Sequence, residues 1–91
     1  MGRREIEVIT ISIAARRCGL APTTIRRYIR WGLVEAPLTE EDLVTLRRIR
    51  RLRELGINLA GIEVILRMRQ RIEELQEEVA RLRAALERGW E

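Results

Sequence analysis

The chain has 91 residues, 18 of them basic and 14 acidic, which gives a net charge of +4, a sequence pI near 10.8 and room for one small domain with an appendage. A single cysteine, Cys18, excludes an internal disulfide, and because histidine is absent we expect no metal site and no cofactor. No apolar run has the length of a signal peptide or of a membrane span, which needs roughly 20 residues, so we expect a cytoplasmic protein.

The positive charge is concentrated in the N-terminal part of the chain. Residues 1–58 hold 12 arginines and 7 acidic residues, a net charge of +5, whereas residues 59–91 hold 6 and 7, a net charge of −1. All 18 basic residues are arginines. Such segregation is typical of a nucleic-acid-binding surface, and an acidic protein partner is the competing explanation.

The first elements are a short extended segment and a short helix. Apolar and polar residues alternate over Glu5–Ile11, which favours a β-strand or an extended entry. Ser12 is placed to cap a helix over Ile13–Cys18, where Cys18 is expected to be a small buried filler. Residues 19–21 then form a tight turn into the next helix.

A basic helix follows and reads PTTIRRYIRWGL. Pro22 suits the first helical position, and Gly32 suits the left-handed conformation that ends a helix. Helical periodicity divides the segment into two faces. The polar face holds Thr23, Arg26, Arg27 and Arg30, and the apolar face holds Ile25, Tyr28 and Ile29. The sequence therefore predicts a helix-turn-helix whose second helix presents guanidiniums to phosphates and guanine edges, with an ordinary solvated basic face as the alternative.

Capping residues delimit the next two helices. Thr39 and Asp42 form a capping box for a helix that Gly56 ends, and Asn58 caps the last helix. The third helix is predicted to bury Leu43, Leu46, Ile49 and Leu52 and to expose Arg47, Arg48, Arg50, Arg51 and Arg53.

The last helix carries the clearest periodicity, a coiled-coil seam with alternating spacings of three and four residues. The seam comprises Ile65, Met68, Ile72, Leu75, Val79, Leu82 and Leu86. One small chain cannot cover it, so we expect a homodimer, with residues 1–57 as the DNA-binding domain and residues 58–91 as the dimerisation helix. Charges do not settle the orientation, because an antiparallel pair would bring Arg71 to Glu78 but also Arg69 to Arg83.

A resemblance to the MerR family of bacterial regulators is carried by ISIAARRCGLAPTTIRRYIRWGLV. In that family a first helix, a turn and a recognition helix end in a TLRYYE-like stretch and a GL pair; here these are Thr24–Tyr28, then Gly32 and Leu33. The following LTEEDLVTLRRIRRLRELGINLAGIEVIL is similar to the family's second helix pair, and GINLAGI resembles the HspR-type heat-shock repressors. The resemblance covers residues 8–86. It implies a mainly α winged-helix domain, a long antiparallel dimerisation helix and a two-fold symmetric operator in double-stranded DNA.

One departure from the family concerns its β-hairpin wing. Only Val34–Leu38 separate the GL pair from the capping box, so the wing and its backbone contacts are essentially absent. The same shortened layout resembles CbpM-type chaperone modulators, which bind a DnaJ-type co-chaperone instead of DNA. We keep that function as the alternative, although a protein-binding module has no physical need for three arginines on one exposed helix face.

Nothing in the sequence indicates an enzyme: there is no histidine, no nucleophile paired with a base and no phosphate-binding glycine loop. We also expect no effector domain after the coiled coil. We expect the following residues to contact DNA: Arg16, Arg17, Thr23, Thr24, Arg26, Arg27, Tyr28, Arg30, Arg47 and Arg51.

Overall fold

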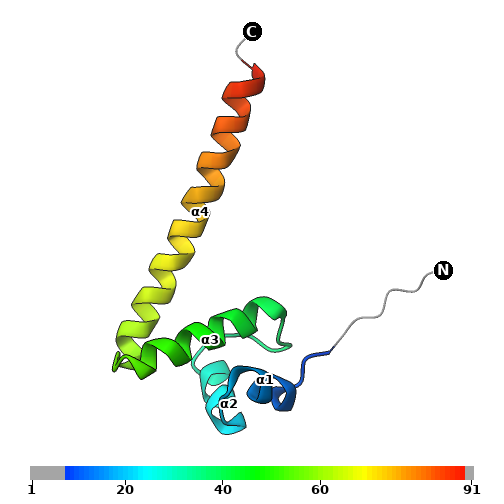
Figure 1. The fold of residues 1–91 in the computed structure, drawn as a ribbon, viewed down its shortest axis with the longest axis vertical. Helices are drawn as coiled ribbons and strands as arrows, with labels where there is room; N and C mark the ends of the chain where they lie inside the picture. Colours follow the sequence, from blue (N-terminus) through cyan, green and yellow to red (C-terminus); the bar gives the residue numbers. More distant parts are fainter. Residues whose placement is uncertain (1–7, 90–91) are drawn as a thin grey trace, which may run out of the picture. The chain divides into compact units, whose positions relative to one another are not determined.

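The computed structural model describes residues 8–89, which form four helices (Figure 1). In chain order these are α1 (Ile11–Cys18), α2 (Pro22–Arg30), α3 (Glu40–Glu54) and α4 (Leu59–Gly89). The predicted mainly α fold is confirmed. The chain divides between Ile57 and Asn58 into two compact units, and each is described by itself below. Among the described residues, no helix is long and apolar enough to cross a membrane.

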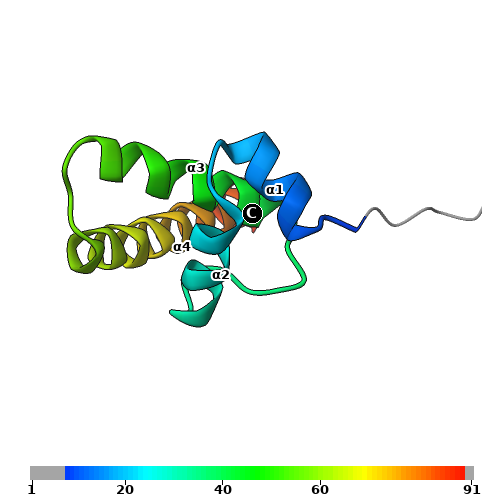
Figure 2. The same cartoon turned by 90° about the horizontal axis from the view of Figure 1, so that it is seen from below.

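In the first unit, α1 packs against both α2 and α3 (Figure 2). The buried core of this unit consists of Ala14, Ala15, Cys18, Ile25, Tyr28, Val34, Leu38, Leu43, Leu46 and Ile49. The apolar faces predicted for α2 and α3 are therefore confirmed, with Ile29 and Leu52 half-buried at their edges. This core fixes the direction in which the polar faces of α2 and α3 point.

Helix α1 begins earlier than its sequence predicts. Thr10, and not Ser12, caps it: the Thr10 hydroxyl accepts a hydrogen bond of 3.1 Å from the backbone N–H of Ile13. The prediction of an extended segment up to Ile11 is consequently wrong at its end, because Ile11 is already helical. Ile9 makes only an isolated antiparallel bridge with Leu38, and residues 5–7 of the expected strand lie outside the described residues.

Cys18 is a core residue, as predicted. It is a free cysteine, 2% exposed, and its thiol donates to the backbone carbonyl of Leu43, with Sγ 3.6 Å from the oxygen. Burial raises the pKa of the Cys18 thiol, because desolvation disfavours the thiolate. The side chain therefore fills space between α1 and α3.

The other helix ends follow the predicted capping. Pro22 is the first residue of α2, and Gly32 adopts φ +80 just after the helix, where the N–H of Leu33 donates to the Tyr28 carbonyl at 2.9 Å. At α3, the Thr39 hydroxyl accepts from the Asp42 N–H while the Asp42 carboxylate accepts from the Thr39 N–H, a complete capping box.

The segment between α2 and α3 contains no hairpin. Within residues 31–39, the side chains of Val34 and Leu38 are buried and attach this segment to the core. The Leu38 bridge to Ile9 is its one β-type pairing among the described residues. The chain thus passes directly from α2 to the capping box of α3.

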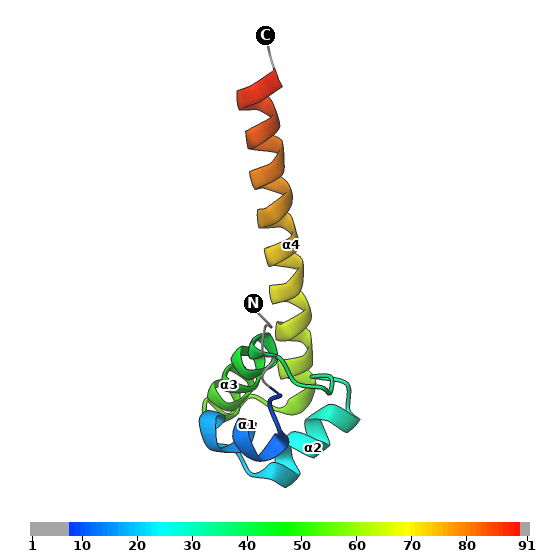
Figure 3. The ribbon, with the colours of Figure 1, turned by 90° about the vertical axis from the view of Figure 1, so that its right-hand side faces the viewer.

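The second unit is helix α4, which runs without interruption for 31 residues (Figure 3). Its predicted cap is confirmed, since the Asn58 side-chain oxygen accepts a hydrogen bond of 2.8 Å from the N–H of Gly61. Ion pairs between Arg69 and Glu73 and between Arg71 and Glu74 lie along its surface. These pairs join neighbouring turns of the same helix, which is the arrangement that supports an exposed helix.

Candidate nucleic-acid interface

The outward face of α2 is basic and free of carboxylates. Arg26, Arg27 and Arg30 are exposed, as is Thr23, while Thr24 is half-buried. Within residues 8–89, none of the three arginines pairs with an acidic side chain, and the first turn of α2 contains no acidic residue. The predicted division of α2 into a basic face and a buried face is confirmed, and the three guanidiniums are available to an anionic ligand.

Tyr28 does not belong to this exposed face. It is only 1% exposed, so its ring is part of the core, and its direct contact with DNA stays a prediction. Its ring centroid lies 6.3 Å from that of Trp31, the residue that ends α2. Tyr28 thus packs against the C-terminal turn of α2 from the core side.

Trp31 is a surface residue that the sequence reasoning missed. The residue is 45% exposed, and the Arg27 guanidinium carbon lies 5.8 Å from the ring centroid. A cation over an aromatic face at this distance is attracted by the ring quadrupole. The spacing of four residues between the two side chains on a helix was the available sequence signal. Of the three arginines on this face, Arg27 is the one that contacts an aromatic ring within the described residues.

On α1, Arg16 and Arg17 are both exposed but differ in their contacts. The guanidinium of Arg17 donates to both carboxylate oxygens of Glu40, at 2.9 and 3.0 Å, and so ties the end of α1 to the start of α3. This hydrogen bonding lowers the pKa of Glu40. Arg17 would have to share its donors between Glu40 and a phosphate, whereas Arg16 has no such competing carboxylate among residues 8–89.

Three of the five arginines of α3 lie around a hollow of about 320 Å³. Its lining residues are Arg17, Cys18, Arg47, Arg50, Arg51 and Glu54. Arg47 is half-buried and Arg51 exposed, and neither has an ion pair within the described part of the chain. The structure therefore brings Arg17, Arg47 and Arg51, three of the predicted phosphate contacts, to one place.

Arg50 is a structural member of this group that sequence reasoning did not single out. Its Nη1 donates to the Cys18 carbonyl at 3.1 Å, and its Nε donates to Glu54 at 3.1 Å. The guanidinium also lies against Gly19, where an added Cβ would collide with it. Gly19 has φ +70 as well, and this left-handed backbone conformation is the reason that glycine is favoured in this turn.

Comparison with known proteins shows the family to which this part of the chain belongs. A family model described as a MerR HTH family regulatory protein matches residues 9–69. The chain belongs to the MerR family. It is also similar to a Streptomyces coelicolor protein named as a heat shock protein, HspR. The two sequences are 40% identical over an alignment of 89 residues, which covers 88% of this chain. The chain spans 59% of the length of that relative. No solved structure gives a significant match.

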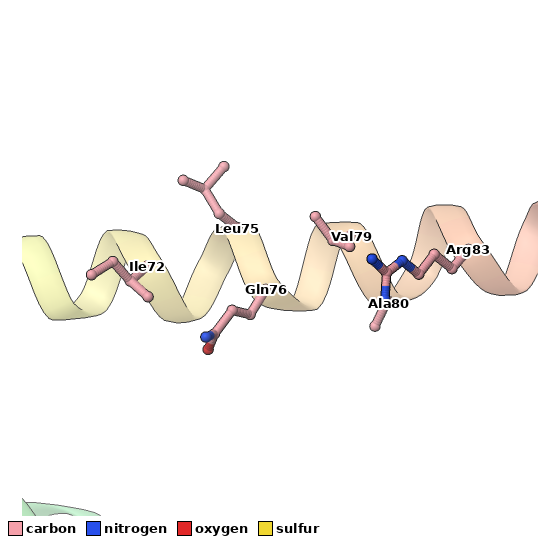
Figure 4. A pocket seen from close by; sticks show the side chains of 6 residues that line it. All are labelled: Ile72, Leu75, Gln76, Val79, Ala80 and Arg83. Atoms are coloured by element: carbon pink, nitrogen blue, oxygen red, sulfur yellow. The ribbon is translucent and has the colours of Figure 1, made fainter.

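In this MerR-family chain, the predicted dimerisation residues form an open apolar stripe along α4. Ile65 is half-buried, and the other six (Met68, Ile72, Leu75, Val79, Leu82 and Leu86) are 42–60% exposed. The middle of the stripe forms a shallow depression of about 390 Å³ beside Ile72, Leu75 and Val79 (Figure 4). Six large apolar side chains in one line leave a long hydrophobic surface on this helix.

Proposed function

We propose that this chain is a transcriptional regulator of the MerR type that binds a two-fold symmetric operator in double-stranded DNA as a homodimer. The observation that carries the proposal is the exposed face of α2, where Arg26, Arg27 and Arg30 have no carboxylate partner within the described residues. The opposite face is fixed in the core through Ile25 and Tyr28. A rigid helix with free guanidiniums has the form required to enter a major groove.

The arginines divide into two roles in this proposal. Those on α2 face the groove, where a guanidinium reads guanine through a bidentate pair, with Thr23 and Thr24 beside them. Arg16, Arg17, Arg47 and Arg51 lie on supporting helices and contact phosphates, which fix the register of the protein without reading sequence. The family membership and the similarity to HspR support DNA regulation as the setting for both roles.

The homodimer is proposed from the apolar stripe of α4. A second copy of the same stripe is the partner that matches its heptad spacing, and two copies related by a two-fold axis require an operator of the same symmetry. In this arrangement residues 1–57 bind DNA and residues 58–91 hold the two protomers together. The proposal assigns the protein no catalytic role.

Binding to duplex DNA from the region upstream of its own gene tests the proposal. A dimer that neutralises a few phosphates per protomer is expected to show a log–log salt slope of at least about −4, since each neutralised phosphate contributes about −0.9. A scrambled duplex of the same length is the control. No binding to any such duplex, together with capture of a DnaJ-type co-chaperone from host lysate, would contradict the proposal and support the chaperone-modulator alternative.

A further inference from the structure

A second hollow, of about 300 Å³, is lined by residues of both α2 and α3. From α2 it is lined by Thr24, Arg27 and Tyr28, and from α3 by Arg50, Arg53 and Glu54. Three guanidiniums therefore surround a space that contains one carboxylate. The excess of positive charge defines the ligand as an anion.

The single carboxylate is already engaged. Glu54 accepts the Arg50 Nε hydrogen bond at 3.1 Å, and Arg50 is held a second time by the Cys18 carbonyl. Arg50 and Glu54 therefore form an ion pair on one side of the hollow, and their opposite charges cancel. The remaining positive charge belongs to Arg27 and Arg53, which are exposed and have no ion pair within residues 8–89.

Arg27 also contacts an aromatic ring outside the hollow. Its guanidinium lies over the Trp31 ring, and Trp31 in turn lies beside the buried ring of Tyr28. A guanidinium restrained in this way loses less conformational entropy when it binds an oxyanion than a freely rotating one does. In the part of the chain that the structure describes, Arg26 and Arg30 have no such ring contact.

The geometry points to a binding site for one phosphate group in this hollow, held by Arg27 and Arg53, with the Thr24 hydroxyl as a further donor. The inference rests on the proposed function, in which the group is a phosphate of the DNA backbone beside the groove that α2 enters. It gives α3 a backbone contact close to the recognition helix in a chain that has no hairpin between α2 and α3. Base reading by α2 then falls to Arg26 and Arg30.

Charge-neutralising variants test the site on DNA. Arg27→Gln and Arg53→Gln are each expected to weaken binding to a specific and to a scrambled duplex by the same factor, about tenfold. Because each variant alters the site in both protomers of the proposed dimer, the salt slope is expected to become shallower by about 1.8. Arg81→Gln, which removes an exposed charge from α4, is the matched control and is expected to leave both unchanged. Circular dichroism melting checks that each variant remains folded. If Arg27→Gln weakens only the specific duplex, or Arg53→Gln behaves like Arg81→Gln, the inference is wrong.

A fluorescence titration separates a backbone phosphate from a free one. Trp90→Phe leaves Trp31 as the sole tryptophan, and its emission reports on the Arg27 contact. Inorganic phosphate is added against sodium chloride at equal ionic strength. A saturable change that Arg53→Gln abolishes shows that free phosphate also occupies the hollow, whereas no change combined with the expected duplex losses assigns the site to the DNA backbone. If the protein binds no duplex but shows a saturable response to phosphate, the proposed function is wrong and the phosphate site remains. If it binds no duplex and shows no response to phosphate, the proposed function and the phosphate site are both wrong.

Discussion

Shortening one side chain of the α4 stripe is expected to weaken the dimer by an amount that follows from its exposure. Leu75 is 42% exposed on the single chain. Full burial of a leucine contributes about 1.5–3 kcal/mol, so covering the exposed part contributes about 1 kcal/mol per protomer. Two protomers lose this contribution in Leu75→Ala, which amounts to about 2 kcal/mol and about a thirtyfold rise in the dimer dissociation constant. A cavity left in the seam would add to the loss.

Sedimentation equilibrium measures this constant directly. Alanine favours helix, so the variant is expected to keep its helical circular dichroism and to lose association only. Glu77→Ala is the matched control, because a residue two positions further along a helix points to the other side. Leu75→Glu places a charge in the seam and is expected to give monomers. A wild-type chain that sediments as a monomer, or a Leu75→Ala variant that dimerises like the wild type, would refute the assignment of the seam.

Three further outcomes are expected from the first unit. Arg26→Ala or Arg30→Ala is expected to cost about 1–3 kcal/mol per half-site on a specific duplex and to relax preference at one position in each half-site; equal losses on a scrambled duplex would count against base reading. The hydrogen bond from Arg17 lowers the pKa of Glu40, so its contribution to stability is present above the unfolded-state pKa, about 4.3, and is lost as the pH falls through the lower folded-state value. Thermal melts at decreasing pH are therefore expected to show a smaller acid-induced loss in Glu40→Gln than in the wild type, and identical losses would contradict the pairing. Cys18 is expected to react with a thiol reagent far more slowly in the folded than in the unfolded protein, because burial both covers the thiol and raises its pKa; equal rates would show that it is accessible.

The helix ends that depend on local interactions could be predicted from the sequence. Pro22, the Thr39–Asp42 box and Asn58 act within one turn of their own helices, so their residue types were sufficient. The start of α1 was different, because Thr10 and Ser12 both have side chains that cap helices. The choice between them depends on how the helix packs in the core, which local sequence does not determine.

The candidate site was predictable to the extent that it follows helical periodicity. The spacing of Arg26, Arg27 and Arg30 placed them on the exposed face of α2, and it also placed Tyr28 on the buried face. The assignment of Tyr28 as a DNA contact came from the resemblance to the family and disagreed with that periodicity. A residue's membership in a family motif therefore did not establish a direct contact with the ligand.

The contacts between helices could not be predicted from the sequence. Arg17 and Glu40 are 23 residues apart, and Arg50 and the Cys18 carbonyl are 32 residues apart. With so many arginines in the chain, periodicity shows which side of a helix each one occupies but not which carboxylate or carbonyl it meets. The packing of α1 against α3 determines which carboxylate or carbonyl each guanidinium contacts. It therefore also determines which guanidiniums remain available to an anion.

Selection of binding sites from a pool of random duplexes tests the central claim most directly. The wild-type protein is expected to enrich an inverted repeat, because two copies of α2 related by a two-fold axis read two equivalent half-sites. An Arg26→Ala, Arg30→Ala double variant is expected to enrich no such sequence while still binding duplexes at low salt through phosphate contacts. Enrichment of no sequence by the wild-type protein, or of the same repeat by the double variant, would contradict the assignment of α2 as the recognition helix.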